Sequence, residues 1–395
     1  MEMLGLYLAV PFCRSKCTYC NFASGVFSSS YHERYIFRIE KDLSSIRQRA
    51  RKWGAHLSQA VDSIYLGGGT PSLLSPALIR RLFTAVRREF AVLPTAEITV
   101  ECAPGQLDAE VLSALLECGA TRVSFGVQSF VDSEARAIGR LHNRAVALED
   151  IRRVHAAGIG DVSVDLIAGL PGQTMASWYE SLNVLADSGV DHASVYMLEV
   201  DDASRLGREL LVNGGRYRAK QVPSDDAIAD LYTEAIGFLA GQGLAQYEIS
   251  NFARPDCESR HNLKYWRREP YLGFGLDAHS MVRSHSGSAM RFGTTENLDK
   301  YLEDPGWERP RQLDREEEME EAWFLGLRLN EGVSLAALRQ EFSASAVRGF
   351  LSTIAELEEE NLVIFTSGDQ VALTARGRLL SNEVFERFLA EPAVA

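Results

Sequence analysis

Short apolar runs alternate with longer amphipathic stretches through about residue 200 of the chain. Several of the runs are apolar almost throughout, as expected of parallel strands that are covered on both faces. The stretches between them carry helix signals: Ser75 and Pro76 form an N-cap followed by proline at the first helical position, and Gly119 and Gly158 close two further helices. The sequence therefore predicts strands over residues 6–10, 63–66, 97–101, 122–127, 162–167 and 193–198.

Six strand–helix units in series predict an α/β fold. Right-handed crossovers join consecutive parallel strands and place them in one sheet. This sheet is either open or curled into a partial barrel, and hydrophobic periodicity alone does not separate the two outcomes.

The second half of the chain changes character. Residues 201–222 are polar and irregular, a helix is predicted for 223–240, and 246–251 form a further extended segment. Asp, Pro, Glu and Arg dominate 303–316, a composition typical of a linker. The predicted domains are a barrel over 1–302, with a distal segment at 240–302, and a separate domain over 317–395.

The C-terminal segment predicts a small α+β domain. Its order of two helices, a hairpin and a last helix is typical of a winged-helix-like fold. The predicted elements are helices over 317–345, 346–360 and 375–390, and a hairpin of strands 362–366 and 370–373 with its turn at 367–369.

The charge balance excludes one class of partner. The 395 residues include 41 Lys and Arg against 54 Asp and Glu, a formal net charge of −13. A nucleic-acid-binding protein needs a basic face to displace counterions from phosphates, so we expect no nucleic-acid partner.

No apolar run approaches the ~20 residues that span a membrane, and the N-terminal residues lack the basic region and cleavage site of a signal peptide. We therefore expect no integral membrane segment and a cytoplasmic protein.

Three of the six cysteines, Cys13, Cys17 and Cys20, lie within eight residues directly after the first predicted strand. Ligand sites of α/β folds occupy this carboxyl edge, and thiolates select zinc, copper(I) or iron–sulfur clusters. A structural zinc site closes four protein ligands around the metal, whereas a cubane held by three cysteines leaves one iron open to a chelating molecule. The alternatives are a zinc site completed by a distant histidine, the nearest being His32, and a disulfide that leaves an odd thiol.

The spacing C-x-x-x-C-x-x-C, within the longer strings Tyr7-x-x-x-Pro-Phe-Cys and Tyr-Cys-x-Phe22, resembles the HemN/HemW branch of the radical S-adenosylmethionine (SAM) superfamily. The resemblance implies a partial six-unit (β/α) TIM-like barrel with a [4Fe–4S] cluster on Cys13, Cys17 and Cys20. It places Tyr7 at the cofactor site. It also implies that SAM chelates the open iron and that an electron from the cluster cleaves SAM to methionine and a 5′-deoxyadenosyl radical.

Glycines follow the second predicted strand, in the string from Gly67 to Thr70. Glycine lets the backbone approach a ligand closely, although a glycine run by itself is also typical of a tight turn between a strand and a helix. The resemblance implies that Gly68, Gly69 and Thr70 contact the amino group of SAM. It assigns Glu101, which closes the third strand, to SAM as well.

Polar residues also stand at the ends of the next strands. Gln128 ends the fourth strand, and Arg140 follows it in the chain. An arginine–carboxylate bond to the methionyl group is charge-assisted and geometrically specific. Asp165 lies inside an otherwise apolar strand, so it needs either a hydrogen-bonding ligand such as ribose hydroxyls or an internal partner. The resemblance places all three residues beside SAM.

His261 and Tyr265 belong to the string His-Asn-Leu-Lys-Tyr-Trp. In a helix they lie one turn apart on one face. Imidazole is a common heme ligand and phenolate a rarer one, although a histidine beside aromatic residues is also typical of core packing. The string resembles the signature that is associated with heme binding in the HemW branch, so both residues are candidate heme ligands.

The resemblance leaves two functions open. Oxygen-independent coproporphyrinogen III dehydrogenases carry a further cysteine where this chain has Phe22, and a longer N-terminal extension. Both departures favour a HemW-like heme chaperone that delivers heme to respiratory hemoproteins, with flavodoxin or ferredoxin as electron donor. The alternative is the dehydrogenase, which decarboxylates coproporphyrinogen III by radical chemistry. A third reading is a zinc-stabilised barrel of unrelated activity. Whether the protein is an enzyme, and its oligomeric state, are not indicated.

Overall fold

The computed structural model describes residues 3–304, 307–366 and 369–389. Each of the six predicted strands is present, and together they form the parallel centre of one sheet. Their order along the sheet follows their order along the chain, as right-handed crossovers require. The six strands are β1 (Leu4–Val10), β3 (Ala60–Gly68), β4 (Ala91–Cys102), β5 (Arg122–Gln128), β6 (Asp161–Ala168) and β7 (His192–Met197).

The sheet continues beyond this parallel centre at both edges. On one side β1 pairs with the parallel strand β10, which is followed by an antiparallel meander, and on the other side β7 pairs with antiparallel β9. Within the described residues the end strands β13 and β8 do not pair, so the curled sheet is a partial barrel. The added strands are β2 (Ala55–His56), β8 (Ala245–Gln246), β9 (Asn251–Ala253), β10 (Tyr271–Phe274), β11 (His279–Ser284), β12 (Ala289–Gly293) and β13 (Arg311–Gln312).

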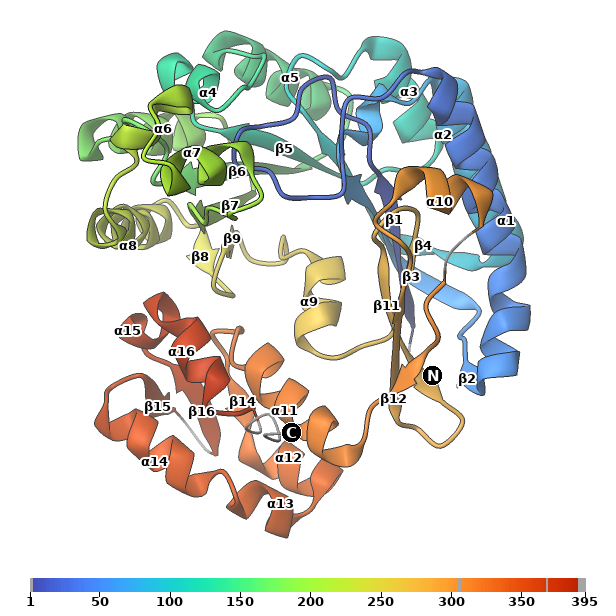
Figure 1. The fold of residues 1–395 in the computed structure, drawn as a ribbon, viewed down its shortest axis with the longest axis vertical. Coiled ribbons are helices and arrows are strands. Elements are labelled where there is room, and N and C mark those ends of the chain that lie inside the picture. Colours follow the sequence, from blue (N-terminus) through green and yellow to red (C-terminus); the bar gives the residue numbers. More distant parts are fainter. Residues whose placement is uncertain (1–2, 305–306, 367–368, 390–395) are drawn as a thin grey trace.

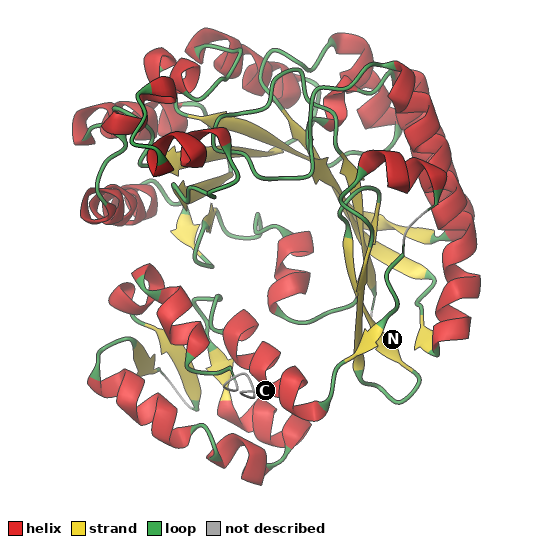
Figure 2. Ribbon diagram, in the orientation of Figure 1, coloured by secondary structure: helices red, strands yellow, loops and turns green. Residues whose placement is uncertain are grey.

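Helices cover the outer face of the curved sheet (Figures 1 and 2). The predicted N-cap of α2 is confirmed, because the Ser75 side chain accepts a hydrogen bond from the Leu78 N–H. None of the helices in the described part of the chain combines the length and the apolar composition that a membrane crossing requires. The helices of the barrel are α1 (Ser30–Trp53), α2 (Pro76–Glu89), α3 (Ala109–Glu117), α4 (Asp132–Ala137), α5 (Arg144–Ala156), α6 (Met175–Asp187), α8 (Asp225–Gly241) and α10 (Leu298–Glu303).

The two faces of the parallel strands differ in polarity. In β4, Ile98 and Val100 are buried in the core under the helices, whereas Glu97, Thr99 and Glu101 alternate with them and lie on the inner face. Both faces of the strands are covered, as expected, because inner-face residues such as Ser63, Thr99 and Ser163 are buried too, but these residues are polar. Helices cover the outer face, and the inner face carries polar side chains toward the lumen.

The segment after β7 is more regular than its composition predicts. Residues 201–222 contain the helix α7 (Arg205–Leu211) and the short 3-10 helix η2 (Arg216–Gln221). The Ser204 side chain caps α7 by accepting from the Gly207 N–H, and Leu206 is buried in a small apolar cluster. Burial against the barrel, which polar composition does not reveal, orders this segment.

The C-terminal unit is helical with a small antiparallel sheet, as predicted, but its helices are shorter. The predicted helix over 317–345 is interrupted after Gly326, by a turn that ends at Gly332 with a left-handed φ of +72° and by the strand that follows. The predicted last helix breaks at Leu380, and residues 367–368 of the hairpin turn and 390 lie outside the described residues. The elements are α11 (Arg315–Gly326), β14 (Val333–Ser334), α12 (Leu335–Phe342), α13 (Ala344–Arg348), α14 (Leu351–Glu359), β15 (Val363–Phe365), β16 (Gln370–Leu373), α15 (Ala375–Leu379) and α16 (Ser381–Glu386).

A short helix, α9 (Arg260–Trp266), lies between the barrel and the C-terminal unit (Figure 1). On its C-terminal side Arg267 and Arg268 form ion pairs with Glu331 and Glu341, at 3.2 and 2.7 Å. The proposed domain boundary remains a prediction. Within the expected linker, β13 pairs with β12, and α11 already begins at Arg315.

Candidate functional site

The loop after β1 carries the three clustered cysteines and is pinned at several points. Its neck is closed by two backbone hydrogen bonds, from Cys13 N to Gly25 O and from Gly25 N to Pro11 O, both 2.9 Å. Further along, Thr18 N donates to Ile138 O at 3.1 Å, and Leu206 N of α7 donates to Thr18 O at 2.8 Å. The loop therefore lies across the carboxyl ends of the strands toward α7, where it is the dark blue segment of Figure 1.

Each of the three thiols is free of disulfide bonding and faces a polar partner. The Arg140 guanidinium donates to Cys17 Sγ at 3.4 Å. Cys13 Sγ lies 4.0 Å from the Thr70 hydroxyl, and Cys20 Sγ lies 3.9 Å from the hydroxyl of its loop neighbour Ser24. Burial raises the pKa of the Cys13 thiol.

The residue types of the loop match the ligands of an iron–sulfur cluster, but the three thiols are not gathered at one point in this structure. Three unbridged thiols, presented from one loop with a guanidinium and hydroxyls around them, are the ligand chemistry of such clusters. His32, the nearest histidine in sequence, stacks on Phe12 with ring centroids 4.1 Å apart. Across residues 3–304, 307–366 and 369–389, no three His, Cys, Asp or Glu side chains are grouped as one metal ion would need.

The glycine turn after β3 brings Thr70 to the cysteine loop. A Cβ on Gly69 would lie 2.6 Å from Val10 O, so only glycine allows the turn to pass this close to the end of β1. The turn is fastened by the hydrogen bond from Thr70 N to Phe12 O, 2.8 Å long. The glycine run thus has the structural role of a tight turn, and the same turn places Thr70 beside Cys13 and Gly69 beside the start of the cysteine loop.

Two carboxylates occupy the carboxyl end of the lumen. Glu101 accepts hydrogen bonds from the Tyr65 hydroxyl at 2.9 Å and from Gly68 N at 3.0 Å. Asp165 accepts from the Ser124 hydroxyl at 3.2 Å, an internal partner of the kind that its place in an apolar strand required. Burial and the charge of Asp165 raise the pKa of Glu101 to about 7, and burial raises the pKa of Asp165.

Several buried polar atoms at this end have no hydrogen-bond partner in the described part of the chain. They include Gln128 Oε1 and Arg140 Nε, and Thr99 Oγ1 further down the lumen. The other nitrogens of the Arg140 guanidinium contact Cys17 and the Gly126 carbonyl. Buried polar groups are nearly always paired in folded proteins, so these atoms are available to a polar ligand. A molecule with an amino group, a carboxylate and ribose hydroxyls, such as SAM, fits this set.

Tyr65 belongs to the same end and was missed at the level of sequence. It bonds Glu101, and its ring stacks on that of Tyr7 with centroids 6.1 Å apart. The signal was present in the strand periodicity, because Tyr65 pairs in register with both Tyr7 and Thr99 and therefore shares their inner face. A strict alternation test on the second predicted strand would have found it.

His261 and Tyr265 lie on α9, at the other end of the lumen. The predicted helix is confirmed: the two side chains meet one turn apart, with His261 Nε2 2.8 Å from the Tyr265 hydroxyl. His261 Nδ1 lies 3.0 Å from the Ser63 hydroxyl, near the amino end of β3. Glu97 on β4 accepts from His261 N, four residues before Glu101, which corresponds to about 13 Å along the strand. The structure therefore does not bring the heme candidates to the cysteines.

Burial controls the electrostatics of this pair. The His261 imidazole is fully buried, and burial together with the nearby Lys264 charge lowers its pKa to about 3. Burial also raises the pKa of the Tyr265 phenol well above its ordinary value. At neutral pH the pair is therefore a neutral imidazole beside a protonated phenol, a description that suits core packing and leaves the heme assignment a prediction.

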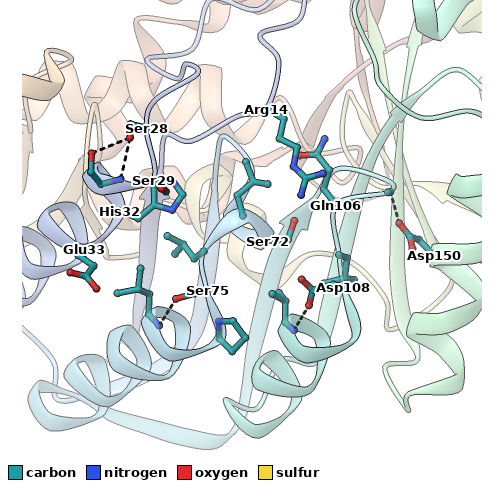
Figure 3. Close-up of a pocket in the computed structure, with 18 of the residues that line it drawn as sticks. Arg14, Ser28, Ser29, His32, Glu33, Ser72, Ser75, Gln106, Asp108 and Asp150 are labelled. Atoms are coloured by element: carbon teal, nitrogen blue, oxygen red, sulfur yellow. Dashed lines mark hydrogen bonds between the residues drawn. The ribbon is translucent and has the colours of Figure 1, made fainter.

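A separate cavity of about 840 Å³ opens on the outer side of the barrel rim, between the amino ends of α1, α2 and α3 (Figure 3). Arg14 of the cysteine loop reaches into it beside Gln106. Two of its carboxylates are already engaged, since Asp108 caps α3 and Asp150 accepts from Gly105 N at 2.6 Å. None of the residues predicted to bind the cluster, SAM or heme lines this cavity.

Comparison with known proteins agrees with this geometry. Residues 7–185 match the radical SAM superfamily, and residues 313–380 match the HemN C-terminal domain. The fold also matches the solved structure of coproporphyrinogen III oxidase (HemN) from Escherichia coli, with a TM-score of 0.83 at 24% identity, over 98% of this chain and 90% of that one. This likeness shows the fold.

Curated relatives match over nearly the full length. The chain is 33% identical to the heme chaperone HemW of Bacillus subtilis, covering 98% of this chain and 100% of that protein. It is 31% identical to the protein of the same name from Lactococcus lactis, covering 98% and 97%. With three cysteines on the loop after β1 and this likeness along the whole chain, the protein belongs to the HemW family of the radical SAM superfamily.

Proposed function

We propose that this protein is a cytoplasmic heme chaperone that carries a SAM-ligated [4Fe–4S] cluster and delivers heme to respiratory hemoproteins. The observation that carries the proposal is the likeness, over 98% of the chain, to relatives named heme chaperone HemW. Phe22, at the position where coproporphyrinogen III dehydrogenases have a further cysteine, supports the same choice. A small one-electron carrier such as flavodoxin or ferredoxin is the proposed reductant of the cluster.

The carboxyl end of the lumen is the proposed cofactor site. Cys13, Cys17 and Cys20 would hold the cluster, which, when bound, supplies the electron that cleaves SAM. Arg140 has one nitrogen without a partner in the part of the chain that the structure describes, and it would bind the methionyl carboxylate of SAM. Glu101, with its pKa near 7, can accept hydrogen bonds from an amino or hydroxyl group as a carboxylate or donate one as an acid.

The opposite end of the lumen is the proposed heme site, with His261 as the axial ligand. Its imidazole is neutral at any physiological pH, which is the protonation state that ligates iron. Tyr265 is the second candidate. Its raised pKa keeps the phenol protonated, and a protonated phenol is a poor iron ligand, so His261 is the favoured one. In this structure both ring nitrogens of His261 are hydrogen-bonded, and heme binding therefore requires one of these contacts to open.

The experiment that tests the proposal is anaerobic reconstitution with iron and sulfide, followed by hemin titration of the same sample. We expect cluster absorption, SAM binding, and a hemin Soret band that shifts when His261 is replaced by alanine. A sample that binds zinc without iron or sulfide, or an unchanged Soret spectrum in His261→Ala, would contradict the corresponding part of the proposal.

The alternative function is oxygen-independent coproporphyrinogen III dehydrogenase. The HemN likeness concerns the fold, so it does not favour this activity. The reconstituted protein is therefore incubated with reductant, SAM and coproporphyrinogen III. The chaperone proposal expects no protoporphyrinogen at enzymatic turnover, and its formation would replace the proposal with the alternative.

A further inference from the structure

The His261 ring is held between two hydroxyl groups. Nδ1 lies 3.0 Å from Ser63 Oγ, and Nε2 lies 2.8 Å from the hydroxyl of Tyr265, one turn further along α9. The backbone of this turn is fixed from the barrel side, because Glu97 accepts from both Arg260 N at 2.9 Å and His261 N at 3.0 Å. The helix backbone that carries the His261 ring is therefore fixed by Glu97, whereas Nε2 of the ring is contacted only by the Tyr265 side chain among the described residues.

A second histidine on the inner face also contacts one serine hydroxyl and one tyrosine hydroxyl. His192 of β7 places Nδ1 2.8 Å from Ser163 Oγ and Nε2 3.0 Å from the Tyr247 hydroxyl. Both histidines are buried, and both tyrosines are half-buried. The barrel thus contains two Ser–His–Tyr groups of the same chemistry at two different places.

The two groups differ in how their tyrosine hydroxyl is held. The Tyr247 hydroxyl also accepts a hydrogen bond from Ser259 N at 3.2 Å, which fixes it at the start of α9. The Tyr265 hydroxyl has no second hydrogen bond among the described residues, and its contact with His261 is the only one that holds it. Moving the Tyr265 hydroxyl therefore costs one hydrogen bond, whereas moving the Tyr247 hydroxyl costs two.

We propose that Tyr265 is a displaceable cap on His261 and that Ser63 is the residue that positions its ring. Heme iron takes the place of the Tyr265 hydroxyl at Nε2, and the contact between Nδ1 and Ser63 keeps the imidazole in its present orientation. A ligating histidine commonly donates its other ring N–H to such an oxygen. His192 is not a heme ligand in this proposal, because the Tyr247 hydroxyl on its Nε2 is held by a second hydrogen bond, from Ser259 N. The inference rests on the proposed function, since it takes heme as the ligand of His261.

The first test uses the protein without heme. Diethylpyrocarbonate acylates accessible imidazole nitrogens, and peptide mass spectrometry reads each histidine separately. We expect His261 to react faster than His192 in the wild type although both are buried. Tyr265→Phe, which keeps the ring and removes the hydroxyl, should raise the His261 rate by about twofold to tenfold, the equivalent of one hydrogen bond. The matched control Tyr247→Phe should leave the His261 rate unchanged.

The second test measures hemin binding by stopped-flow absorption and electron paramagnetic resonance, with circular dichroism to check folding. Tyr265→Phe should bind hemin about twofold to tenfold faster, with the wild-type Soret position. Ser63→Ala should alter the ligand-field spectrum of bound hemin, because Nδ1 loses its partner, while the matched Ser163→Ala should not.

The outcomes of these tests are separable from those of the proposed function. Slower reaction of His261 than of His192, or an unchanged His261 rate in Tyr265→Phe, overturns the cap whether or not heme binds. Identical hemin spectra for the wild type and Ser63→Ala overturn the role of Ser63. A hemin spectrum that is insensitive to His261→Ala instead contradicts the proposed heme site itself.

Discussion

The two ends of the barrel lumen are built from the same strands but differ in how the side chains proposed to bind ligands are paired. At the carboxyl end, buried atoms of Gln128 and Arg140 lack hydrogen-bond partners within the described residues, and Glu101 lies beside a second carboxylate. At the amino end, His261 has both ring nitrogens hydrogen-bonded and Glu97 caps a helix. The carboxyl end therefore offers unpaired atoms to a polar ligand, whereas at the amino end the side chains of His261 and Glu97 already hydrogen-bond other parts of the chain.

Binding of the two proposed kinds of ligand therefore meets different obstacles. SAM and the cluster would satisfy groups that the folded chain leaves unmet, so their binding should stabilise the carboxyl end. Heme at His261 must first break an existing contact in the amino end.

The largest effect is expected from the cysteine loop. Replacing Cys13, Cys17 and Cys20 together with alanine should abolish iron and sulfide binding after anaerobic reconstitution, because no other ligand of the loop can hold the cluster. Iron and sulfide analysis with visible absorption measures this. Alanine at Cys102, Cys118 and Cys257, as the control, should leave the iron content unchanged. Retained iron in the first variant would contradict the assignment of the carboxyl end.

A large loss of stability is expected from the amino end. Arg122 is almost fully buried and bonds Asp161 and the Cys257 carbonyl. Arg122→Leu leaves the Asp161 carboxylate, which is 29% exposed, without its partner, so it should lower the free energy of unfolding by about 3 kcal/mol in urea titrations. Arg80→Leu, in an exposed ion pair, is the matched control and should change it little. Equal losses of unfolding free energy in Arg122→Leu and Arg80→Leu would contradict the expectation that the buried ion pair contributes more than the exposed one.

An intermediate effect concerns pH and the ligand-free carboxyl end. The raised pKa of Glu101, about 7, means that the folded protein binds more protons than the unfolded one between about pH 4.5 and pH 7. Stability should therefore fall as pH rises through this window, by up to about 3 kcal/mol.

Glu101→Gln, which cannot ionise, should remove this component. Urea unfolding of both proteins from pH 5 to pH 8 measures the difference, which should grow with pH in favour of the variant. If the free energies of unfolding of the two proteins changed equally between pH 5 and pH 8, the pKa of Glu101 would not be raised in the folded protein.

The smallest effect is expected where α9 meets the C-terminal unit. Glu341→Gln removes the ion pair with Arg268, and such partly exposed pairs contribute less than about 1 kcal/mol. Hydrogen exchange of the α9 amides should become slightly faster, which would ease the displacement of Tyr265. Glu356→Gln, which removes an exposed pair with Arg387 inside the C-terminal unit, is the control. Unchanged exchange in Glu341→Gln would show that the barrel alone holds α9.

Local signals were sufficient for the strands and several helix ends of the barrel, although not for its curvature. The six strands, the caps at Ser75, Gly119 and Gly158, and the cysteine loop follow from residues close together in the chain. The breaks in the C-terminal helices do not. The first of them ends at Gly326, and Gly332 leads the chain into β14, which pairs with β16 almost forty residues away.

By itself, the sequence determined the spacing of the three thiols and the one-turn spacing of His261 and Tyr265, because both depend only on local geometry. Tertiary structure alone decided that these two groups lie at opposite ends of one lumen. It also supplied Ser63, 198 residues away, as the partner of His261. The physical reason is that strand register and burial set which distant polar atoms meet, and no local pattern of residues records that register.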